Sequence, residues 1–491
     1  MRLVLAGWAL LSVAWLLGNP PFAGPDEGSH YLRALEVGRG HPITEHRPDA
    51  ARGATERQVE WNRELTYEVR VPAGMAPHDF GCYVGDRDAS AACLDDFEPP
   101  RGPTRTVTPV GNYEPLPYLL PGVALRAADS PGPALRWARA ANALLTLVLL
   151  GVALRLAWSP DAGPLSLLGP IVAVTPMAIF CGSVLNGSGP EIAAAIAFAC
   201  ALLRLRRDPT CARSPRVWAA VGATGALLAL ARALGPLWLV LIAAAVAGLV
   251  GARAAYGLVR AGGRRAAAAL AAVAVATGLN LAWESAHGPH VDVGLANARA
   301  VVDDAVSEWW RASSELVGKF SYLEFRLPAV AYVAWFAAGF ALIAVAAAVA
   351  ARRERAALLA ALAAGALLPM ALFVVAIRQT GFGLQGRYVL PVLAAIPIAA
   401  GDVLRERAAS VTARTRRALL IGIPAAAAAV HLVAWYWNAR RVAVGSDGPL
   451  VFVGSAEWSP PLGWLPWLAL AAIGAALVAA APLRLSRGWR A

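Results

Sequence analysis

The sequence predicts an all-α integral membrane protein with about 12 transmembrane helices. Hydrophobic residues make up 58% of its 491 residues and charged residues only 15%, whereas an average soluble protein carries about 25% charged residues. Apolar runs of roughly 17 to 25 residues recur along the chain, and each is long enough to cross a bilayer. Arginines gather in the short segments between these runs, which is typical of multi-spanning membrane proteins.

The expected elements follow from the apolar runs in order. Residues 3–18 are expected as an uncleaved first helix; the alternative is a cleaved signal peptide, because the run is short and Ala23 follows it. The stretch 113–127 is broken by prolines and is expected at the membrane surface. Further membrane helices are expected to begin near Trp137, Pro164, Pro190, Val217, Pro236, Ala266, Pro328, Ala356, Tyr388, Ala418 and Leu462.

The distribution of arginine predicts the orientation of the chain. Cytoplasmic loops carry an excess of basic residues, and a cytoplasmic N-terminus places the arginine-rich connections on that side. Both termini are then cytoplasmic, and the segments 19–112 and 284–327 are large extracytoplasmic loops, the first of them the longest. The whole chain, 1–491, is expected to form one polytopic domain in a bacterial plasma membrane, since its arginine, alanine and glycine content suggests a GC-rich bacterial genome.

The net charge of +12 and the pI of 10.1 raise the question of nucleic-acid binding. Such binding requires a basic surface with interleaved aromatic residues, and the arginines here are instead divided among short loops. The lipid bilayer is therefore the expected partner, and no nucleic acid is expected.

The cysteines divide into two groups. Cys82 and Cys93 share the first extracytoplasmic loop, which faces an oxidising compartment, and a disulfide between them is expected. Cys181, Cys200 and Cys211 lie within or near membrane helices and are expected to be small buried hydrophobic residues.

The stretch 20–31, directly after the first helix, contains the first candidate site residues. Asp26 and His30, at positions i and i+4 of a helix, would share a face. A carboxylate at this boundary could deprotonate a hydroxyl group or, with His30, hold a divalent metal ion. The alternative is purely structural: Pro25 suits the first position of a helix, and Asp26 and Glu27 suit its positive dipole end.

Other candidates lie far along the chain. Arg387 and Tyr388 stand at the outer mouth of a late helix, where Arg387 could bind a phosphate group or simply anchor the helix at the interface. Asn186 lies in a polar loop, and Glu191 begins the helix that follows. Glu191 could belong to a site or could only complement the helix dipole.

Three motifs together resemble a bacterial membrane-protein family catalogued as domain of unknown function 2142. They are the proline-rich run into Asp26-Glu27 with His30 and Arg33, the polar loop 181–191, and the loop-to-helix stretch 385–391. One departure is the Asn-Gly-Ser of 186–188, where the family has an Asn-Pro-Asp type of sequence. The architecture also resembles the C-type (GT-C fold) glycosyltransferase superfamily, and the stretch 113–118 resembles the proline–aromatic segment of those enzymes.

The resemblance implies a glycosyltransferase that moves a sugar from a polyprenyl-phosphate donor to an extracytoplasmic glycan or lipid acceptor of the cell envelope. It assigns catalysis to Asp26 and Glu27. Substrate binding is expected of His30, Arg387, Tyr388, Asn186 and Glu191, with Arg378 as the alternative to Arg387. The other classes that remain open are a transporter or flippase for lipid-linked saccharides and an assembly component of an envelope-polysaccharide system.

Overall fold

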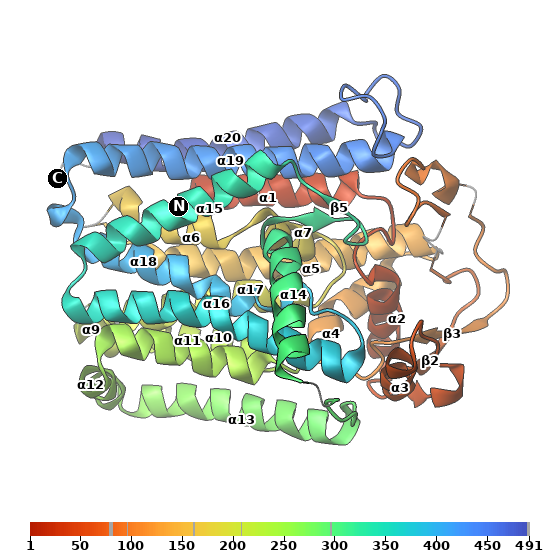
Figure 1. Ribbon diagram of the computed structural model, residues 1–491, viewed down its shortest axis with the longest axis horizontal. Helices are drawn as coiled ribbons and strands as arrows, with labels where there is room; N and C mark the ends of the chain where they lie inside the picture. Colours follow the sequence, from red (N-terminus) through yellow and green to blue (C-terminus); the bar gives the residue numbers. More distant parts are fainter. Residues whose placement is uncertain (78–81, 96, 161–162, 208, 295–296, 489–491) are drawn as a thin grey trace.

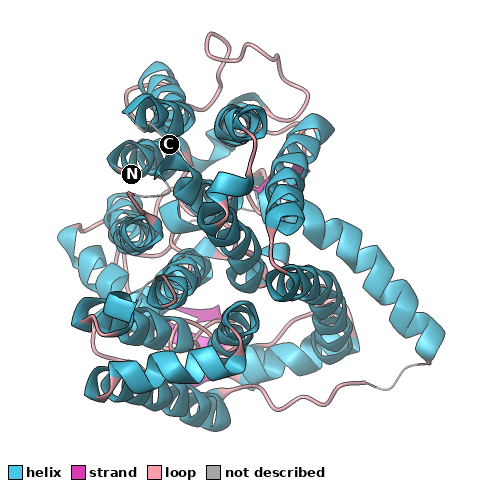
Figure 2. Cartoon of the chain, turned by 90° about the vertical axis from the view of Figure 1, so that its left-hand side faces the viewer, coloured by secondary structure: helices cyan, strands magenta, loops and turns pink. Residues whose placement is uncertain are grey.

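The computed structural model describes residues 1–77, 82–95, 97–160, 163–207, 209–294 and 297–488. Long helices run side by side along one axis, and both termini lie toward the same end (Figure 1). Viewed from that end, most of these helices are seen end-on (Figure 2). The helices are α1 (Arg2–Gly18), α5 (Pro131–Ala157), α6 (Leu168–Ala173), α7 (Pro176–Ser183), α8 (Ser188–Leu205), α9 (Pro209–Ala212), α10 (Pro215–Ala229), α11 (Gly235–Val250), α12 (Ala252–Gly262), α13 (Arg264–His287), α15 (Ala329–Val349), α16 (Arg352–Thr380), α17 (Leu390–Leu393), α18 (Ala395–Glu406), α19 (Ala413–Val444) and α20 (Leu465–Gly488).

The structure is that of a multi-pass membrane protein. Within the described ranges, 7 helices are long and apolar enough to cross a membrane, or up to 9 if two bent helix pairs each form one span. The bends are 66° between Gly163–Ala173 and α7, and 106° between α11 and α12. The expectation of about 12 spans treated each apolar run as a full crossing; the runs that form α1, α10 and the divided α17–α18 are helical but shorter.

The end opposite the termini holds the first long loop, where a small sheet adds to the expected, mostly helical fold. Besides α2 (Glu27–Gly38) and α3 (Glu56–Leu65), the loop forms an antiparallel sheet of β1 (Glu45–His46), β2 (Tyr67–Val71) and β3 (Thr104–Thr108). Residues of β2 alternate between buried and more exposed, as a half-buried strand requires. A second small sheet pairs β4 (Lys319–Phe320) with β5 (Phe325–Arg326), and α14 (Ala298–Val317) lies across the long helices (Figure 1).

A small hydrophobic core fixes α2 against the bundle. Phe22 and Tyr31 pack edge-to-face with ring centroids 5.2 Å apart, and both are buried in a cluster that also includes residues of α4 (Leu116–Ala124) and α5. A glycine pair permits the close approach of α2 and α4: a Cβ on Gly38 would lie 2.2 Å from the Gly122 carbonyl oxygen. This packing determines where the chain just before α2 is held.

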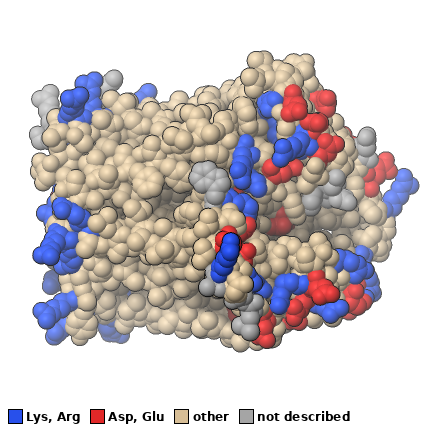
Figure 3. All heavy atoms as spheres, in the orientation of Figure 1, with Lys and Arg blue, Asp and Glu red and all other residues tan. Residues whose placement is uncertain are grey.

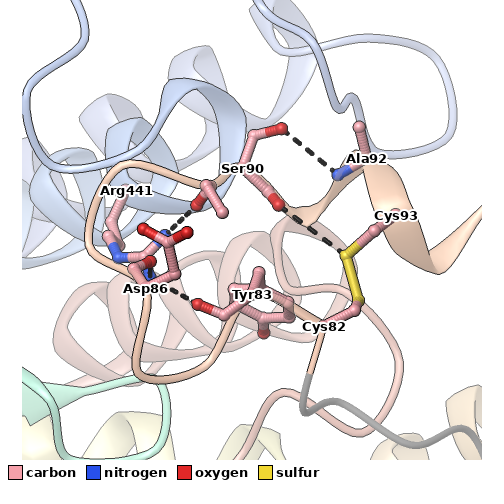
Figure 4. The surroundings of a disulfide bond; sticks show 8 residues. Cys82, Tyr83, Asp86, Ser90, Ala92, Cys93 and Arg441 are labelled. Carbon is pink, nitrogen blue, oxygen red and sulfur yellow. Dashed lines mark hydrogen bonds between the residues drawn. A yellow bond between two sulfur atoms is a disulfide. The ribbon is translucent and has the colours of Figure 1, made fainter.

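The loop with the expected disulfide packs against α19. A disulfide joins Cys82 to Cys93, with their Cα atoms 6.3 Å apart. Arg441 of α19 donates hydrogen bonds to the carbonyl oxygens of Tyr83 and Asp86, at 3.1 and 2.9 Å (Figure 4). The cross-linked loop is therefore tied directly to a membrane helix. The remaining cysteines, Cys181, Cys200 and Cys211, are buried.

Charges are distributed differently at the two ends. On the face shown in Figure 3, basic side chains alone gather at the end with the termini, whereas acidic and basic side chains mix at the opposite end. We call these the arginine end and the cavity end. The contrast follows the loop assignment made from the sequence, since 19–112 and 284–327 both lie at the cavity end (Figure 1).

Candidate functional site

Asp26 immediately precedes α2 but does not cap it. Its backbone is left-handed, with φ 56° and ψ 17°, and its side chain makes no capping hydrogen bond. Instead, Oδ2 accepts a hydrogen bond from Arg387 Nη2 at 2.8 Å, and Oδ1 accepts one from the Tyr322 hydroxyl at 3.2 Å. The carboxylate is therefore directed away from the helix that follows it.

The backbone around Asp26 is strained. A positive φ is unfavourable for residues other than glycine, and among the described residues only five non-glycine residues have one. Four of these five lie in the two segments that meet at Asp26: Phe22, Asp26, Ser321 and Leu323. Strain concentrated in this way costs of order 1–3 kcal/mol per residue and is often found at functional sites.

Asp26 and Arg387 converge although they are 361 positions apart in the sequence. Arg387 lies in the short 3-10 turn Gly386–Tyr388 and is 1% exposed. Burial would raise the pKa of the Asp26 carboxyl, but the Arg387 guanidinium and the other groups around it outweigh burial and hold this pKa below its ordinary value. Asp26 is therefore ionised at neutral pH. Arg387 Nε and Nη1 have no hydrogen-bond partner among the described residues.

A cavity of about 770 Å³, here called the outer cavity, opens in front of Asp26. Residues of the first loop, α14 and the 382–388 segment form its walls. Its lining includes Asp26, Trp61, Tyr113, Arg311, Lys319, Tyr322 and Tyr388.

A second cavity of about 400 Å³, the inner cavity, adjoins the first. Trp61, Tyr113 and Tyr388 line both cavities. On one side, the inner cavity is lined by apolar residues of α16, which is one of the candidate membrane spans. On the other side it is polar, with Asn112, Glu114, Glu191, Arg232 and Glu284.

Arg232, in the turn between α10 and α11, is a site residue that the sequence analysis missed. It donates a hydrogen bond to Ser188 Oγ at 2.8 Å, and its guanidinium carbon lies 4.5 Å from the centroid of the Tyr388 ring. The Arg387 guanidinium lies 5.2 Å from the same ring, so two cations contact Tyr388. A signal was present: Arg232 occupies a short turn on the predicted outer side, where arginine is disfavoured.

Two carboxyl groups in the inner cavity were also missed. Glu114 Oε1 accepts a hydrogen bond from Asn280 Nδ2 at 2.7 Å, and Glu284 of α13 is near it. Burial, and then the neighbouring Glu284 carboxylate, raise the pKa of Glu114 to about 8. Glu114 lies inside the 113–118 stretch that was noted for its resemblance, but its partner is 170 positions away, and no local pattern joins the two.

Glu27 occupies a structural position rather than the expected catalytic one. Its carboxylate pairs with Arg139 of α5, with Nη2–Oε2 and Nε–Oε1 distances of 2.6 and 2.7 Å. The same carboxylate accepts hydrogen bonds from the backbone amides of Gly24 and Leu185. Glu27 is fully buried and lines neither cavity. Its role is to fix α2 to the bundle.

The other predicted residues are divided between the cavities and their support. Tyr388 and Glu191 line the inner cavity, and Glu191 Oε1 accepts a hydrogen bond from Trp238 Nε1 at 3.2 Å. Asn186 Nδ2 donates to the carbonyl oxygen of Pro25 at 3.2 Å, so it braces the segment next to Asp26. His30 Nδ1 lies 2.7 Å from the Tyr118 hydroxyl. Burial lowers the pKa of His30 to about 3, so its ring is neutral.

The geometry does not fit a metal ion at Asp26 and His30. No group of three or more His, Cys, Asp or Glu side chains suited to a metal occurs within the described ranges, and Asp26 already pairs with a guanidinium. Arg378, the alternative to Arg387, pairs with Asp304 at 2.8 Å and lines neither cavity.

Comparisons with known proteins locate the chain among membrane proteins. The sequence model of a family described as predicted membrane protein (DUF2142) matches residues 9–396, a range that holds Asp26, Arg232 and Arg387. No curated protein matches the chain. Among solved structures, the crystal structure of ArnT from Cupriavidus metallidurans bound to undecaprenyl phosphate is similar over 87% of this chain and 76% of its own, with 17% identity and a TM-score of 0.40.

Proposed function

The chain belongs to the DUF2142 family of predicted membrane proteins, as its motifs predicted, and we propose that it is a membrane glycosyltransferase of GT-C-like architecture. It transfers a sugar from a polyprenyl-phosphate donor to a hydroxyl group of an extracytoplasmic glycan or lipid acceptor. The observation that carries the proposal is the position of the ionised Asp26 carboxylate. It does not cap α2 but lines a cavity of about 770 Å³, beside an inner cavity that is lined by Arg232.

Asp26 is the proposed general base. An acceptor hydroxyl is a weak nucleophile until a base removes its proton. In the proposed reaction the acceptor oxygen attacks the anomeric carbon, the bond from this carbon to the phosphate oxygen breaks, and Asp26 takes the hydroxyl proton. Arg387 and Tyr322 position the carboxylate, since each bonds one of its two oxygens.

The proposed phosphate site lies around Tyr388. The departing lipid phosphate gains negative charge, and arginine binds phosphate through a planar fork of donors. Arg232 lines the inner cavity. Arg387 is 1% exposed and lines neither cavity, but it contacts the same Tyr388 ring, and its Nε and Nη1 have no hydrogen-bond partner among the described residues. We therefore extend the role expected of Arg387 to Arg232, which sequence analysis did not identify. No step passes through a metal ion.

The inner cavity also suits the lipid part of the donor. Leu372, Val375 and Ala376 of α16 line it, and α16 is a candidate membrane span. A polyprenyl chain in the bilayer could pack against this wall while its phosphate reaches Arg232. The cavity end then faces the outside, and both termini at the arginine end face the cytoplasm of a bacterial plasma membrane, as the basic loops favour.

The test is sugar transfer in reconstituted membranes from a polyprenyl-phosphate sugar to a hydroxyl acceptor. Asp26→Asn keeps the shape and removes the charge, so the rate should fall by about 10²- to 10⁴-fold. Asp88→Asn is the matched control, because Asp88 is exposed and lines neither cavity. Full activity of a folded Asp26→Asn variant would contradict the proposal. Movement of the intact lipid-linked saccharide across the membrane without transfer would favour a flippase instead.

A further inference from the structure

The inner cavity has more hydrogen-bond acceptors than its own side chains use. Asn112 Oδ1 and Glu191 Oε2 are buried and have no partner within the described part of the chain. Both residues line the cavity, and they are 6% and 1% exposed. A buried acceptor without a partner is unfavourable, with a penalty of about 1–3 kcal/mol. These two atoms therefore indicate a bound molecule that donates hydrogen bonds.

The acceptors do not stand alone. Glu114 and Glu284 line the same cavity, so three carboxyl groups and one amide oxygen surround it. Asn112 Nδ2 is already used, because it donates to the carbonyl oxygen of His287 at 3.0 Å. Asn280 Nδ2 likewise donates a hydrogen bond to Glu114 Oε1. These two amide donors are therefore already engaged, and the oxygens Asn112 Oδ1 and Glu191 Oε2 remain.

Arg232 is the cationic group of the cavity. It contacts the Tyr388 ring and Ser188, and it lines the cavity together with the acidic residues. The cavity thus combines a cation for a phosphate group with a wall of oxygen acceptors. A sugar phosphate has the complementary arrangement, a phosphate followed by a ring of hydroxyl donors.

We propose that the inner cavity binds the sugar of the donor and selects a hydroxyl-rich sugar without a carboxylate. This rests on the proposed transferase function and adds the substrate class to it. Hydroxyl groups of the ring donate to Asn112 Oδ1, Glu191 Oε2 and the carboxyl group of Glu284. A uronic acid would bring a further carboxylate next to Glu114 and Glu284. With Glu114 protonated at neutral pH, these two neighbouring groups share one proton and keep one negative charge, and like charges in close contact disfavour binding.

The size and walls of the cavity agree with this assignment. Its volume of about 400 Å³ is in the range of roughly 300–1,000 Å³ that small-molecule sites occupy. Trp61 lines both cavities and offers an aromatic surface at their junction. The sugar would thus lie within reach of the outer cavity, where Asp26 meets the acceptor.

The experiment compares binding of three probes to the full chain in lipid nanodiscs: polyprenyl-phosphate glucose, polyprenyl-phosphate glucuronic acid, and the polyprenyl phosphate without sugar. The wild type should bind the glucose donor at least about tenfold more tightly than the glucuronic acid donor. In the Glu284→Gln variant this preference should shrink to less than about threefold, whereas Glu114→Gln replaces a group that is already protonated and should retain the preference. Both variants should keep the wild-type affinity for polyprenyl phosphate alone. Glu457→Gln is the control, because Glu457 is exposed and lines neither cavity.

The outcomes separate the two proposals. A wild type that binds polyprenyl phosphate and transfers glucose but shows no preference against glucuronic acid overturns the selectivity alone. A wild type that binds none of the three probes overturns the transferase function. Loss of polyprenyl-phosphate binding in both Gln variants would show that these carboxyl groups only maintain the fold. In that case Asn112→Ser, which shortens one acceptor without changing charge, must still weaken glucose-donor binding for the proposal to stand.

Discussion

The two ends of the bundle use similar residues in opposite ways. At the arginine end, Asp402 pairs with Arg206, Arg207 and Arg405 at 3.2, 3.0 and 3.1 Å, and the cavity beside it measures about 10 Å³. At the cavity end, Glu191 accepts a hydrogen bond from Trp238 and lines a cavity of about 400 Å³, which lies beside the one of about 770 Å³.

The difference teaches how to distinguish structural charge from functional charge in this molecule. A buried acid surrounded by arginines in closed packing stabilises the contact between elements, here between α18 and the two residues that follow α8. A buried carboxyl group that lines a cavity of several hundred Å³, as Glu191 does, instead lies where a small molecule has room to bind. The burial of a charged residue therefore says little until its partners are counted.

The largest effect on stability is expected at the arginine end. Asp402→Asn removes the charge that neutralises three arginines, and loss of one partner of a buried ion pair costs about 3–5 kcal/mol. Thermal unfolding of detergent-solubilised protein should show a clearly lowered midpoint, while the folded protein keeps its sugar-transfer rate. Asp26→Asn should show the reverse, with a small change in midpoint and loss of transfer. Equal destabilisation by both variants would remove the distinction between the two ends.

Removal of the disulfide should have the next largest effect. Replacement of both cysteines, Cys82→Ser with Cys93→Ser, frees a short loop and is expected to lower stability by about 2–3 kcal/mol. The loop is linked to the 319–326 hairpin because Gly85 N donates to Glu324 Oε2 at 3.0 Å and Arg441 pairs with Glu324 at 3.3 Å. Faster limited proteolysis between residues 82 and 93 is the measurement. A cleavage rate equal to that of the wild type would contradict the prediction.

Patterns along the chain predicted the helices and the Asp26–Arg387 pair, but not the charged residues of the inner cavity. Hydropathy located the apolar runs. Location, residue type and the family resemblance together singled out Asp26 and Arg387, which meet at 2.8 Å. Hydropathy could not predict the number of spans, because run length alone does not say where a helix bends. It also could not predict β2, since the short alternation of 67–71 is hidden in a polar loop.

The missed residues share a physical cause. Arg232 and Glu284 reach the site only through the packing of helices distant in sequence, and neither lies in a recognisable motif. Glu27 shows the converse: next to Asp26 in sequence, it points to Arg139 instead, because adjacent residues at the start of a helix face different directions. Sequence adjacency alone therefore does not place both carboxylates at the same cavity.

A smaller effect is expected when arginine is replaced by lysine at the two ends. Arg232→Lys keeps the charge but loses the planar fork, so polyprenyl-phosphate affinity should fall about tenfold, as measured by tryptophan fluorescence titration. Arg264→Lys at the arginine end is the matched control, since Arg264 is exposed and lines neither cavity. Equal affinity of the Arg232→Lys protein and the wild type for polyprenyl phosphate would show that Arg232 does not bind the phosphate.

The smallest expected effect concerns pH and the Glu114 carboxyl group. Its pKa is about 8 in the folded chain against 4.5 for an unperturbed glutamate, because burial and then Glu284 disfavour its charged form. Between these two values the folded state binds more protons than the unfolded state, so stability should fall as the pH rises from about 4.5 to about 8. Glu114→Gln cannot ionise and removes this part of the pH dependence.

The thermal midpoint of the wild type should therefore drop more between pH 5.5 and pH 8.5 than that of Glu114→Gln, with Glu457→Gln behaving like the wild type. Identical pH dependence of Glu114→Gln and the wild type would mean that Glu114 is already ionised in the folded protein, and the inner cavity would then present a permanent negative charge instead of a proton-bearing one.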